Sequence, residues 1–279
     1  MTRWESLFSR RWLGYLAFAV AFAIACGFLS SWQLNRGNEA AAANRLIEAN
    51  FHAPPVPLAE ALPSLDAFDA DQQWLRVTVT GTYLPHEELL VRNRPTASGP
   101  GFEVLTPLRL ADGTVFVVDR GWVPTGEKQD APDSVPAPPV GEVTVIARLK
   151  PSEPHLGTRT ASGRQVATIE LPVVKRRIGG DVYTGAYGVL DTQSPAPASV
   201  PTPVFTSEPT QDEGLHWSYM IQWIIFALIA FFGLGYAVRQ ELRMRALDAQ
   251  DGDAGTPQPA RTAKRTDADI EDEILDAAR

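Results

Sequence analysis

One histidine, His216, stands at the head of an apolar stretch that carries no charged residue from Trp217 to Val238. Imidazole in its neutral form is the side chain that metals in proteins bind most often. On a helix, Tyr219, Met220 and Trp223 would lie on the face beneath this ring, because they follow it at helical spacing. The face could bind a flat, apolar, metal-bearing ligand. It is also consistent with ordinary helix packing around an imidazole that lipid headgroups solvate.

Two stretches are long and apolar enough to cross a bilayer. A helix rises about 1.5 Å per residue, so roughly 20 apolar residues cover the hydrocarbon core of a membrane. The stretch WLGYLAFAVAFAIACGFLSSWQLN predicts one transmembrane helix over residues 12–35, and the stretch that begins LHWSYM predicts a second over residues 215–238. We therefore expect a protein that crosses the membrane twice.

Two other interpretations of the first apolar stretch fit less well. SRRWLG loosely matches a twin-arginine export signal, and AIAC loosely matches a lipoprotein cleavage site at Cys26. However, the apolar run is longer than the core of a signal peptide and continues past Cys26 to Trp32. Its length favours an uncleaved anchor.

Basic residues predict the orientation of both helices. Arg10 and Arg11 precede the first helix and Arg239 follows the second, whereas the opposite ends of the helices adjoin mixed or acidic segments. By the positive-inside rule, both termini lie in the cytoplasm, as an N-terminal tail (residues 1–11) and a C-terminal tail (residues 239–279). Residues 36–214 then form a domain on the outer face of the cell membrane. The polar, mixed-charge C-terminal tail predicts disorder.

The outer domain has the patterns of a β-rich fold. WLRVTVTGTYLP, from Trp74, alternates apolar and polar residues with the period of a half-buried strand. FEVLTPLRLADGTVFVVDRGW predicts a hairpin whose turn is Asp112-Gly113, and GEVTVIARLK and DVYTGAYGVL predict further strands. Helices are expected in NEAAAANRLIEAN, which continues the first span, and in LPVVKRRIG. The fold class is therefore α+β, with two transmembrane helices flanking an antiparallel barrel or a sandwich-like sheet.

Composition excludes several classes of protein. The net charge of -8 argues against a nucleic-acid partner, which requires a basic surface. Cys26 is the only cysteine, so the chain can form neither an intramolecular disulfide nor a CxxC redox site. Covalent CxxCH attachment of haem is excluded for the same reason.

Motifs for catalysis are incomplete, and we do not expect an enzyme. HEELL, from His86, begins like a zinc-protease motif but has Leu90 where the second histidine ligand belongs. Arg120, Gly121 and Trp122, in DRGWVP, could form a contact patch for a partner protein. The alternative is a turn that packs its tryptophan into the sheet.

If the two helices pair as a hairpin, residues of the first helix would also lie beside His216. If the first helix ends near the membrane depth at which the second begins, Trp32, Gln33 and Arg36 stand at the depth of His216. Ala19, Ala23 and Gly27 form a stripe of small residues that would let the helices approach closely. A porphyrin edge could then enter between aromatic side chains, with its propionates near Arg36.

The order of several motifs resembles one known family. SWQLNR ends the first span, VTVTGTYLP, PLRLADGTVFVVDRGWVP and GEVTVIARLKPSEP lie in the outer domain, and HWSYMIQWIIFA opens the second span. Together they resemble the surfeit locus family of cytochrome oxidase assembly proteins, from about Gly27 to Val238. Asp119 departs from the family pattern, which usually has Asn before RGWVP, and Ser30 and Ser31 replace the usual Leu-Gly.

The resemblance implies a factor for the maturation of haem-copper terminal oxidases that holds haem a transiently. His216 would correspond to the family histidine proposed as an axial ligand of the haem iron, with Tyr219, Trp223, Trp32, Gln33 and Arg36 around the cofactor. The implied partners are the catalytic subunit of the oxidase, the enzyme that makes haem a, and the lipid bilayer. The alternative is a membrane scaffold that stabilises oxidase subunits without binding haem and uses the outer sheet with DRGWVP as its contact surface.

Overall fold

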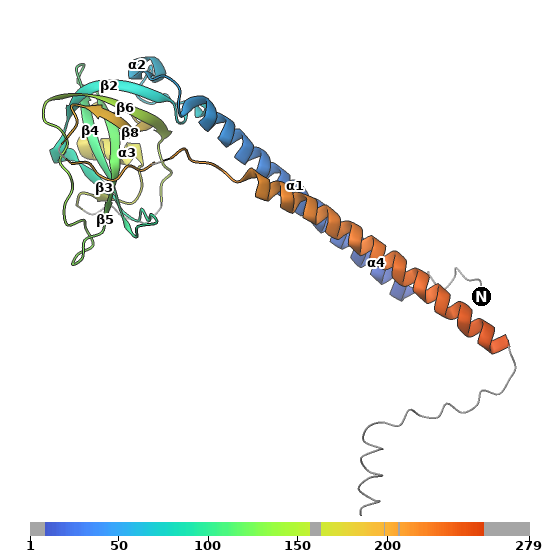
Figure 1. Cartoon of the computed structure of the whole chain (residues 1–279). Helices are drawn as coiled ribbons and strands as arrows, with labels where there is room; N and C mark the ends of the chain where they lie inside the picture. Colours follow the sequence, from blue (N-terminus) through green and yellow to red (C-terminus); the bar gives the residue numbers. More distant parts are fainter. Residues whose placement is uncertain (1–8, 157–162, 198, 206, 254–279) are drawn as a thin grey trace, which may run out of the picture. The chain divides into compact units, whose positions relative to one another are not determined.

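The computed structural model describes residues 9–156, 163–197, 199–205 and 207–253. Two long helices, α1 (Arg10–Asn50) and α4 (Glu213–Asp253), flank a β-rich domain, which confirms the expected α+β class (Figure 1). The chain divides into two compact units. One unit is Leu34–Trp217, and the other combines the residues up to Gln33 with those from Ser218 onward.

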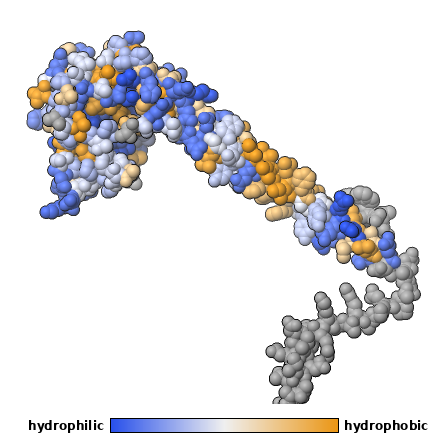
Figure 2. All heavy atoms as spheres, in the orientation of Figure 1, coloured by the Kyte–Doolittle hydropathy of each residue, from blue (hydrophilic) through white to orange (hydrophobic). Residues whose placement is uncertain are grey.

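Both long helices carry large apolar side chains on their surface. Phe18 and Phe28 are each 74% exposed, and Phe232 is 76% exposed. Figure 2 shows these helices with a hydrophobic band. Each helix is long and apolar enough to cross a membrane, and only 17% of the apolar window of α1 and none of that of α4 is buried, whereas a core helix of a soluble protein would be mostly buried. The helices are therefore those of a membrane protein.

The packed stripe of α1 differs from the expected one at Gly27. Ala19 and Ser30 are buried, and the Ser30 hydroxyl donates to the Met220 carbonyl oxygen of α4 at 3.2 Å. Gly27 is exposed, and a Cβ atom there would meet nothing within 4 Å. Eight residues rotate Gly27 by roughly 80° from Ala19, whereas seven bring Cys26 to within roughly 20°. Cys26, which is 2% exposed, takes the place expected for Gly27.

The second long helix extends beyond the predicted span. α4 continues to Asp253, so the prediction of disorder is wrong for residues 239–253. These residues are mostly strong helix formers, and Arg245 donates to Glu241 at 2.7 Å one turn earlier. The rest of the predicted C-terminal tail, residues 254–279, and most of the predicted N-terminal tail, residues 1–8, lie outside the described residues.

In its described residues, the segment between the long helices contains eight strands and several short helices. In chain order they are β1 (Val56–Pro57), α2 (Leu58–Ala61), η2 (Ala70–Gln72), β2 (Arg76–Tyr83), η3 (Pro85–Glu87), β3 (Leu89–Val91), β4 (Gly101–Leu110), β5 (Val115–Pro124), β6 (Glu142–Pro151), β7 (Gln165–Val166), α3 (Leu171–Ile178) and β8 (Ala186–Ser194). The predicted hairpin at Asp112-Gly113 and the helix in LPVVKRRIG are confirmed as β4–β5 and α3. NEAAAANRLIEAN continues α1, as expected.

Five strands close into a barrel. Their order is β2–β6–β8–β5–β4, and β4 pairs back onto β2, with Thr82 opposite Arg109. Gly81 lies at this closure, where a Cβ atom would come within 2.4 Å of the Arg109 carbonyl oxygen. A glycine is therefore required where the two strands meet. Of the two expected architectures, the structure has the barrel.

The barrel is not wholly antiparallel. β8 runs parallel to β5, with Val118 opposite Gly188, while the other four pairings around the ring are antiparallel. Parallel neighbours need a long connection. Here β6 and α3 lie between β5 and β8 in the chain, which provides that length.

β5 is buried on both of its faces. Phe116 and Val118 pack in one core cluster with residues of β2 and β6. Val115 and Val117, on the opposite face, pack in a second cluster that includes α3. This double coverage explains why VFVV reads as a continuous apolar run rather than an alternating one.

Candidate functional site

The first turns of α4 place His216 against α1. A Cβ atom on Gly37 would lie 3.4 Å from His216 Cβ and 3.5 Å from the indole nitrogen of Trp217. A larger side chain at residue 37 would therefore press on the turn that carries the histidine. Gly37 is buried and His216 is half-buried.

Asn44 of α1 fixes the chain just before α4. Its side-chain nitrogen donates to the Gln211 carbonyl oxygen at 2.9 Å, and its side-chain oxygen accepts from the Gln211 N–H at 2.8 Å. Asp212 then accepts from the Leu215 N–H at 3.0 Å, which satisfies one of the free donors at the start of the helix. These bonds hold the turn that precedes His216.

The other residues expected around the ligand lie on α1 and α4. Arg36 is exposed and pairs with Glu39 at 2.8 Å. Trp32 is 56% exposed and Tyr219 is 42% exposed. Gln33 and Trp223 are half-buried. Of this set, only Arg36 belongs to the same compact unit as His216, where it is the neighbour of Gly37 in α1.

The donor chemistry at His216 suits an iron porphyrin better than a bare metal ion. No group of three His, Cys, Asp or Glu side chains in the described part of the chain could hold a metal ion. A porphyrin already supplies four ligands to its iron, so a single imidazole can complete the coordination. Arg36 forms an exposed ion pair with Glu39, which typically contributes about 0–1 kcal/mol, so a ligand carboxylate could replace Glu39.

The three residues expected to form a partner contact are buried instead. Arg120 is 1% exposed, Trp122 is 6% exposed and Gly121 is also buried. They lie on β5, and the Trp122 indole N–H donates to the Arg94 carbonyl oxygen at 2.7 Å. The prediction of direct contact is wrong, because the strand that carries these residues is covered on both faces. The alternative, a tryptophan packed into the sheet, is confirmed.

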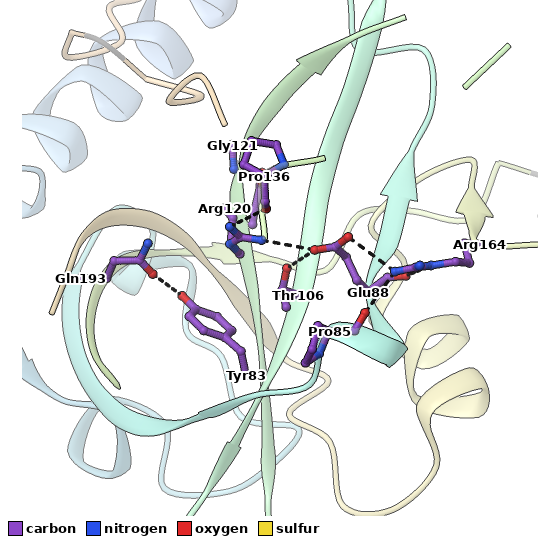
Figure 3. A network of polar contacts seen from close by, with 10 residues as sticks. Tyr83, Pro85, Glu88, Thr106, Arg120, Gly121, Pro136, Arg164 and Gln193 are labelled. Carbon is purple, nitrogen blue, oxygen red and sulfur yellow. Dashed lines mark hydrogen bonds and ion pairs between the residues drawn. The ribbon is translucent and has the colours of Figure 1, made fainter. Parts of the chain in front are cut away.

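Arg120 is the centre of a buried polar network (Figure 3). One of its terminal nitrogens lies 3.2 Å from a Glu88 carboxylate oxygen, and the other donates to the Pro136 carbonyl oxygen at 2.9 Å. Thr106 donates to the same Glu88 oxygen at 3.0 Å, and Arg164 lies 3.4 Å from the second one. Burial lowers the pKa of Arg120, and the Glu88 charge opposes that shift. The network ties the end of η3, where Glu88 lies, to β4, β5 and the β5–β6 connection.

Replacing Gly121 with alanine is expected to destabilise the barrel by about 2–4 kcal/mol. The residue has φ +130°, and a Cβ atom there would lie 2.5 Å from the Thr202 carbonyl oxygen, so steric overlap adds to backbone strain of about 1–3 kcal/mol. Calorimetric unfolding of the full chain measures the loss. Gly113→Ala is the matched control, because Gly113 has φ +86° but open space around it. Equal losses in the two variants would contradict the proposed overlap.

A second cluster of charges lies beside the first. Arg94 bridges Glu103, at 2.8 Å, and Glu153. Burial raises the pKa of Glu103. Burial alone would raise the pKa of Glu153. Hydrogen bonds from Thr168 and the Ile169 N–H outweigh this effect, so the pKa is lowered. Asp119 is 1% exposed, and its pKa is raised well above the ordinary range by burial and then by the Glu103 charge.

Asp119→Asn is expected to stabilise the protein at alkaline pH. An aspartate with a raised pKa binds a proton in the folded state that the unfolded state has lost above about pH 4, so stability falls as pH rises toward the folded-state pKa. Asparagine removes this loss and keeps the side-chain oxygen that accepts from the Gly121 N–H at 3.1 Å. Each pKa unit corresponds to ~1.4 kcal/mol, or a Tm change of about 3–6 °C for a chain of this size.

Thermal unfolding at pH 4, 6 and 8 tests this prediction. The gain in Tm from Asp119→Asn should grow with pH. Asp112→Asn is the control with the opposite sign, because a hydrogen bond from the Thr114 side chain lowers the pKa of that exposed turn residue. If Asp119→Asn has the same Tm as the wild type at pH 8, the buried carboxyl group does not destabilise the folded protein at that pH.

Sequence reasoning missed several residues that the structure makes important. Glu88 lies in EELLVRN, which reads as an ordinary strand start, and its partner Arg120 is 32 residues later. Gly37 and Asn44 in RGNEAAAAN read as part of a helical continuation. The available signal was Gly37 itself. A glycine inside a segment that otherwise favours a helix destabilises the helix by about 1 kcal/mol, so its presence usually reflects close packing.

Comparison with known proteins places this architecture in a family. The sequence matches the SURF1 family over residues 20–228. It is 35% identical to a SURF1-like protein of Mycobacterium tuberculosis over 93% of each chain. It is also 35% identical to a SURF1-like protein of Monosiga brevicollis over 48% of this chain and 52% of the relative. The match to the cytochrome oxidase assembly protein Shy1 of Saccharomyces cerevisiae is 28% identical over 48% of this chain and 33% of the relative. With its two apolar helices and the barrel between them, the chain belongs to the SURF1 family.

Proposed function

We propose that this protein is a membrane-anchored assembly factor for cytochrome oxidase, and that His216 is an axial ligand for the iron of haem a while the catalytic subunit matures. The main support is the half-buried His216, held against Gly37 in a member of the SURF1 family. The printed name of the yeast relative, a cytochrome oxidase assembly protein, supports the assembly role.

The proposed topology places both termini in the cytoplasm and the barrel on the outer face of the cell membrane. Arg10 and Arg11 at one helix end and Arg239 and Arg243 at the other support this orientation by the positive-inside rule. His216 then lies at the outer boundary of the bilayer. Its partners there would be the catalytic subunit of a haem-copper oxidase and the enzyme that makes haem a.

A carrier of haem must also release it. One histidine ligand can exchange, whereas covalent attachment through cysteine cannot. Cys26 is the only cysteine of the chain, and it is 2% exposed within α1. A single histidine ligand therefore supports transient rather than permanent binding of the cofactor.

The competing function is a scaffold that stabilises oxidase subunits without binding haem. The contact surface expected for it included Arg120, Gly121 and Trp122, and these are buried. A scaffold would have to use another part of the barrel, so the haem-carrier proposal has the stronger support.

Deleting the gene in its native host tests the assembly role. We expect cytochrome oxidase activity and the haem content of its catalytic subunit to fall, and a wild-type copy to restore both. Respiratory dehydrogenase activity in the same membranes should not change. Normal oxidase activity in the deletion strain would contradict the role in assembly.

A further inference from the structure

Asn44 lies on the face of α1 that packs against the start of α4. It follows Gly37 by seven residues, which brings it to within roughly 20° of that glycine around the helix axis. Gly37 packs against His216 Cβ, and Asn44 is half-buried two turns further along. Asparagine is a poor helix former, and here it follows a run of alanine, residues 40–43. Its presence inside α1 therefore reflects a tertiary contact.

That contact is with the backbone of Gln211. The Asn44 side chain donates to the Gln211 carbonyl oxygen at 2.9 Å and accepts from the Gln211 N–H at 2.8 Å. Residues 207–212, which lead into α4, have no regular secondary structure, so their position depends on contacts of this kind. Because hydrogen bonds are directional, two of them to one residue fix both its place and its orientation relative to α1.

The position of Gln211 determines where the first turn of α4 lies. α4 begins at Glu213, whose N–H donates to the Gln211 carbonyl oxygen at 3.1 Å. Asp212 accepts from the Leu215 N–H at 3.0 Å, as a residue that caps a helix does. His216 lies in this same first turn. Hydrogen bonds thus connect α1, through Gln211, to the turn that carries the imidazole.

From these contacts we propose that Asn44 is a positioning residue for His216, which fixes the first turn of α4 so that the imidazole meets the haem iron in one orientation. The inference rests on the proposed function of His216 as a haem ligand. Asn44 acts through the backbone of α4, and Gly37 provides the second point of contact with the same turn. Replacing a group that orients a metal ligand typically weakens binding of the metal by about 10–100-fold.

Titration of the full-length protein in detergent micelles with haem a, followed by absorption, tests this role. We expect Asn44→Ala to bind haem a about 10–100-fold more weakly than the wild type. Alanine is a stronger helix former than asparagine, so α1 should stay formed in the variant. If Asn44→Ala binds haem a with the affinity of the wild type, the inference is overturned.

Asn50→Ala is the matched control. Asn50 also lies on α1 and also bonds to backbone, because its side-chain nitrogen donates to the carbonyl oxygens of Asp71 and Gln73 at 2.7 and 2.8 Å. These partners lie at η2 and its end, not at α4. The two alanine variants should lower the Tm by similar amounts, but Asn50→Ala should bind haem a like the wild type. Equal losses of haem affinity in both variants would reduce the role of Asn44 to general stability and overturn the inference.

Amide hydrogen exchange at the start of α4 provides a measurement that needs no haem. In Asn44→Ala, the N–H groups of Glu213 and Leu215 should exchange about tenfold faster than in the wild type, as expected when the hydrogen bonds that hold this turn are lost. In Asn50→Ala they should exchange at the wild-type rate. Unchanged exchange in Asn44→Ala would overturn the inference whether or not haem binds. If exchange rises as expected but the wild type binds no haem a, the proposed function of His216 fails, while the positioning of α4 by Asn44 is supported.

Discussion

Replacing His216 with alanine is expected to reduce cytochrome oxidase activity to near that of the deletion strain when the variant is the only copy of the gene. The imidazole is the proposed iron ligand, and alanine offers no donor atom in its place. Altering a group that merely orients a metal ligand already weakens binding by about 10–100-fold, so losing the ligand itself should cost more than ~100-fold in haem affinity. Oxidase activity and membrane haem content measure the effect.

A second histidine variant separates this effect from a general loss of the protein. His86 is an exposed residue on η3 of the barrel, so His86→Ala should restore oxidase activity fully. Immunoblots of membranes should show equal amounts of both variants. A His216→Ala protein that supports normal oxidase activity would favour the scaffold over the haem carrier.

Glu88→Gln is expected to destabilise the barrel by about 3–5 kcal/mol, because it leaves the Arg120 charge buried without its counter-ion. The Arg120 side chain is 0% exposed and that of Glu88 is 10% exposed, so solvent cannot replace the lost carboxylate. For a chain of this size, the Tm should fall on the order of 10 °C. Calorimetry of the full-length protein measures the fall.

The neighbouring Glu87 provides the matched control, since it is exposed on η3 and the same change there should leave the Tm within about 1 °C. The double variant Glu88→Leu with Arg120→Met should be less destabilised than Glu88→Gln alone, because it removes both charges together. If Glu88→Gln unfolds at the temperature of Glu87→Gln, the buried pair does not stabilise the barrel.

The local architecture could largely be predicted from the sequence. The β4–β5 hairpin follows from Asp112-Gly113 between two apolar runs, and Gly113 does have positive φ. The two membrane helices follow from uninterrupted apolar runs. Such features depend on neighbouring residues, so periodicity and turn chemistry are enough to predict them.

Closure of the barrel could not be predicted, because it depends on pairings between distant strands. The contact of Thr82 with Arg109 and the parallel pairing of Val118 with Gly188 leave no local signal. Burial of Arg120 was hidden for the same reason. A charged residue in a strand normally indicates an exposed face, and the counter-ion that makes the burial of Arg120 tolerable, Glu88, is 32 residues away in the chain.

The histidine of the candidate site could be predicted from the sequence, but the residues that hold it in place could not. An imidazole at the start of an uncharged helix marks His216 without any alignment. Its packing against Gly37, and the anchoring of Gln211 by Asn44, join segments more than 160 residues apart. These residues become recognisable only when the two helices are seen together.

The absorption spectrum of the full-length protein, purified from cells that make haem a, tests the central claim most directly. We predict that the wild type carries the haem a spectrum, that His86→Ala retains it and that His216→Ala loses it at equal protein yield. A colourless wild type, or a His216→Ala variant with an unchanged spectrum, would contradict the assignment of His216 as the haem ligand.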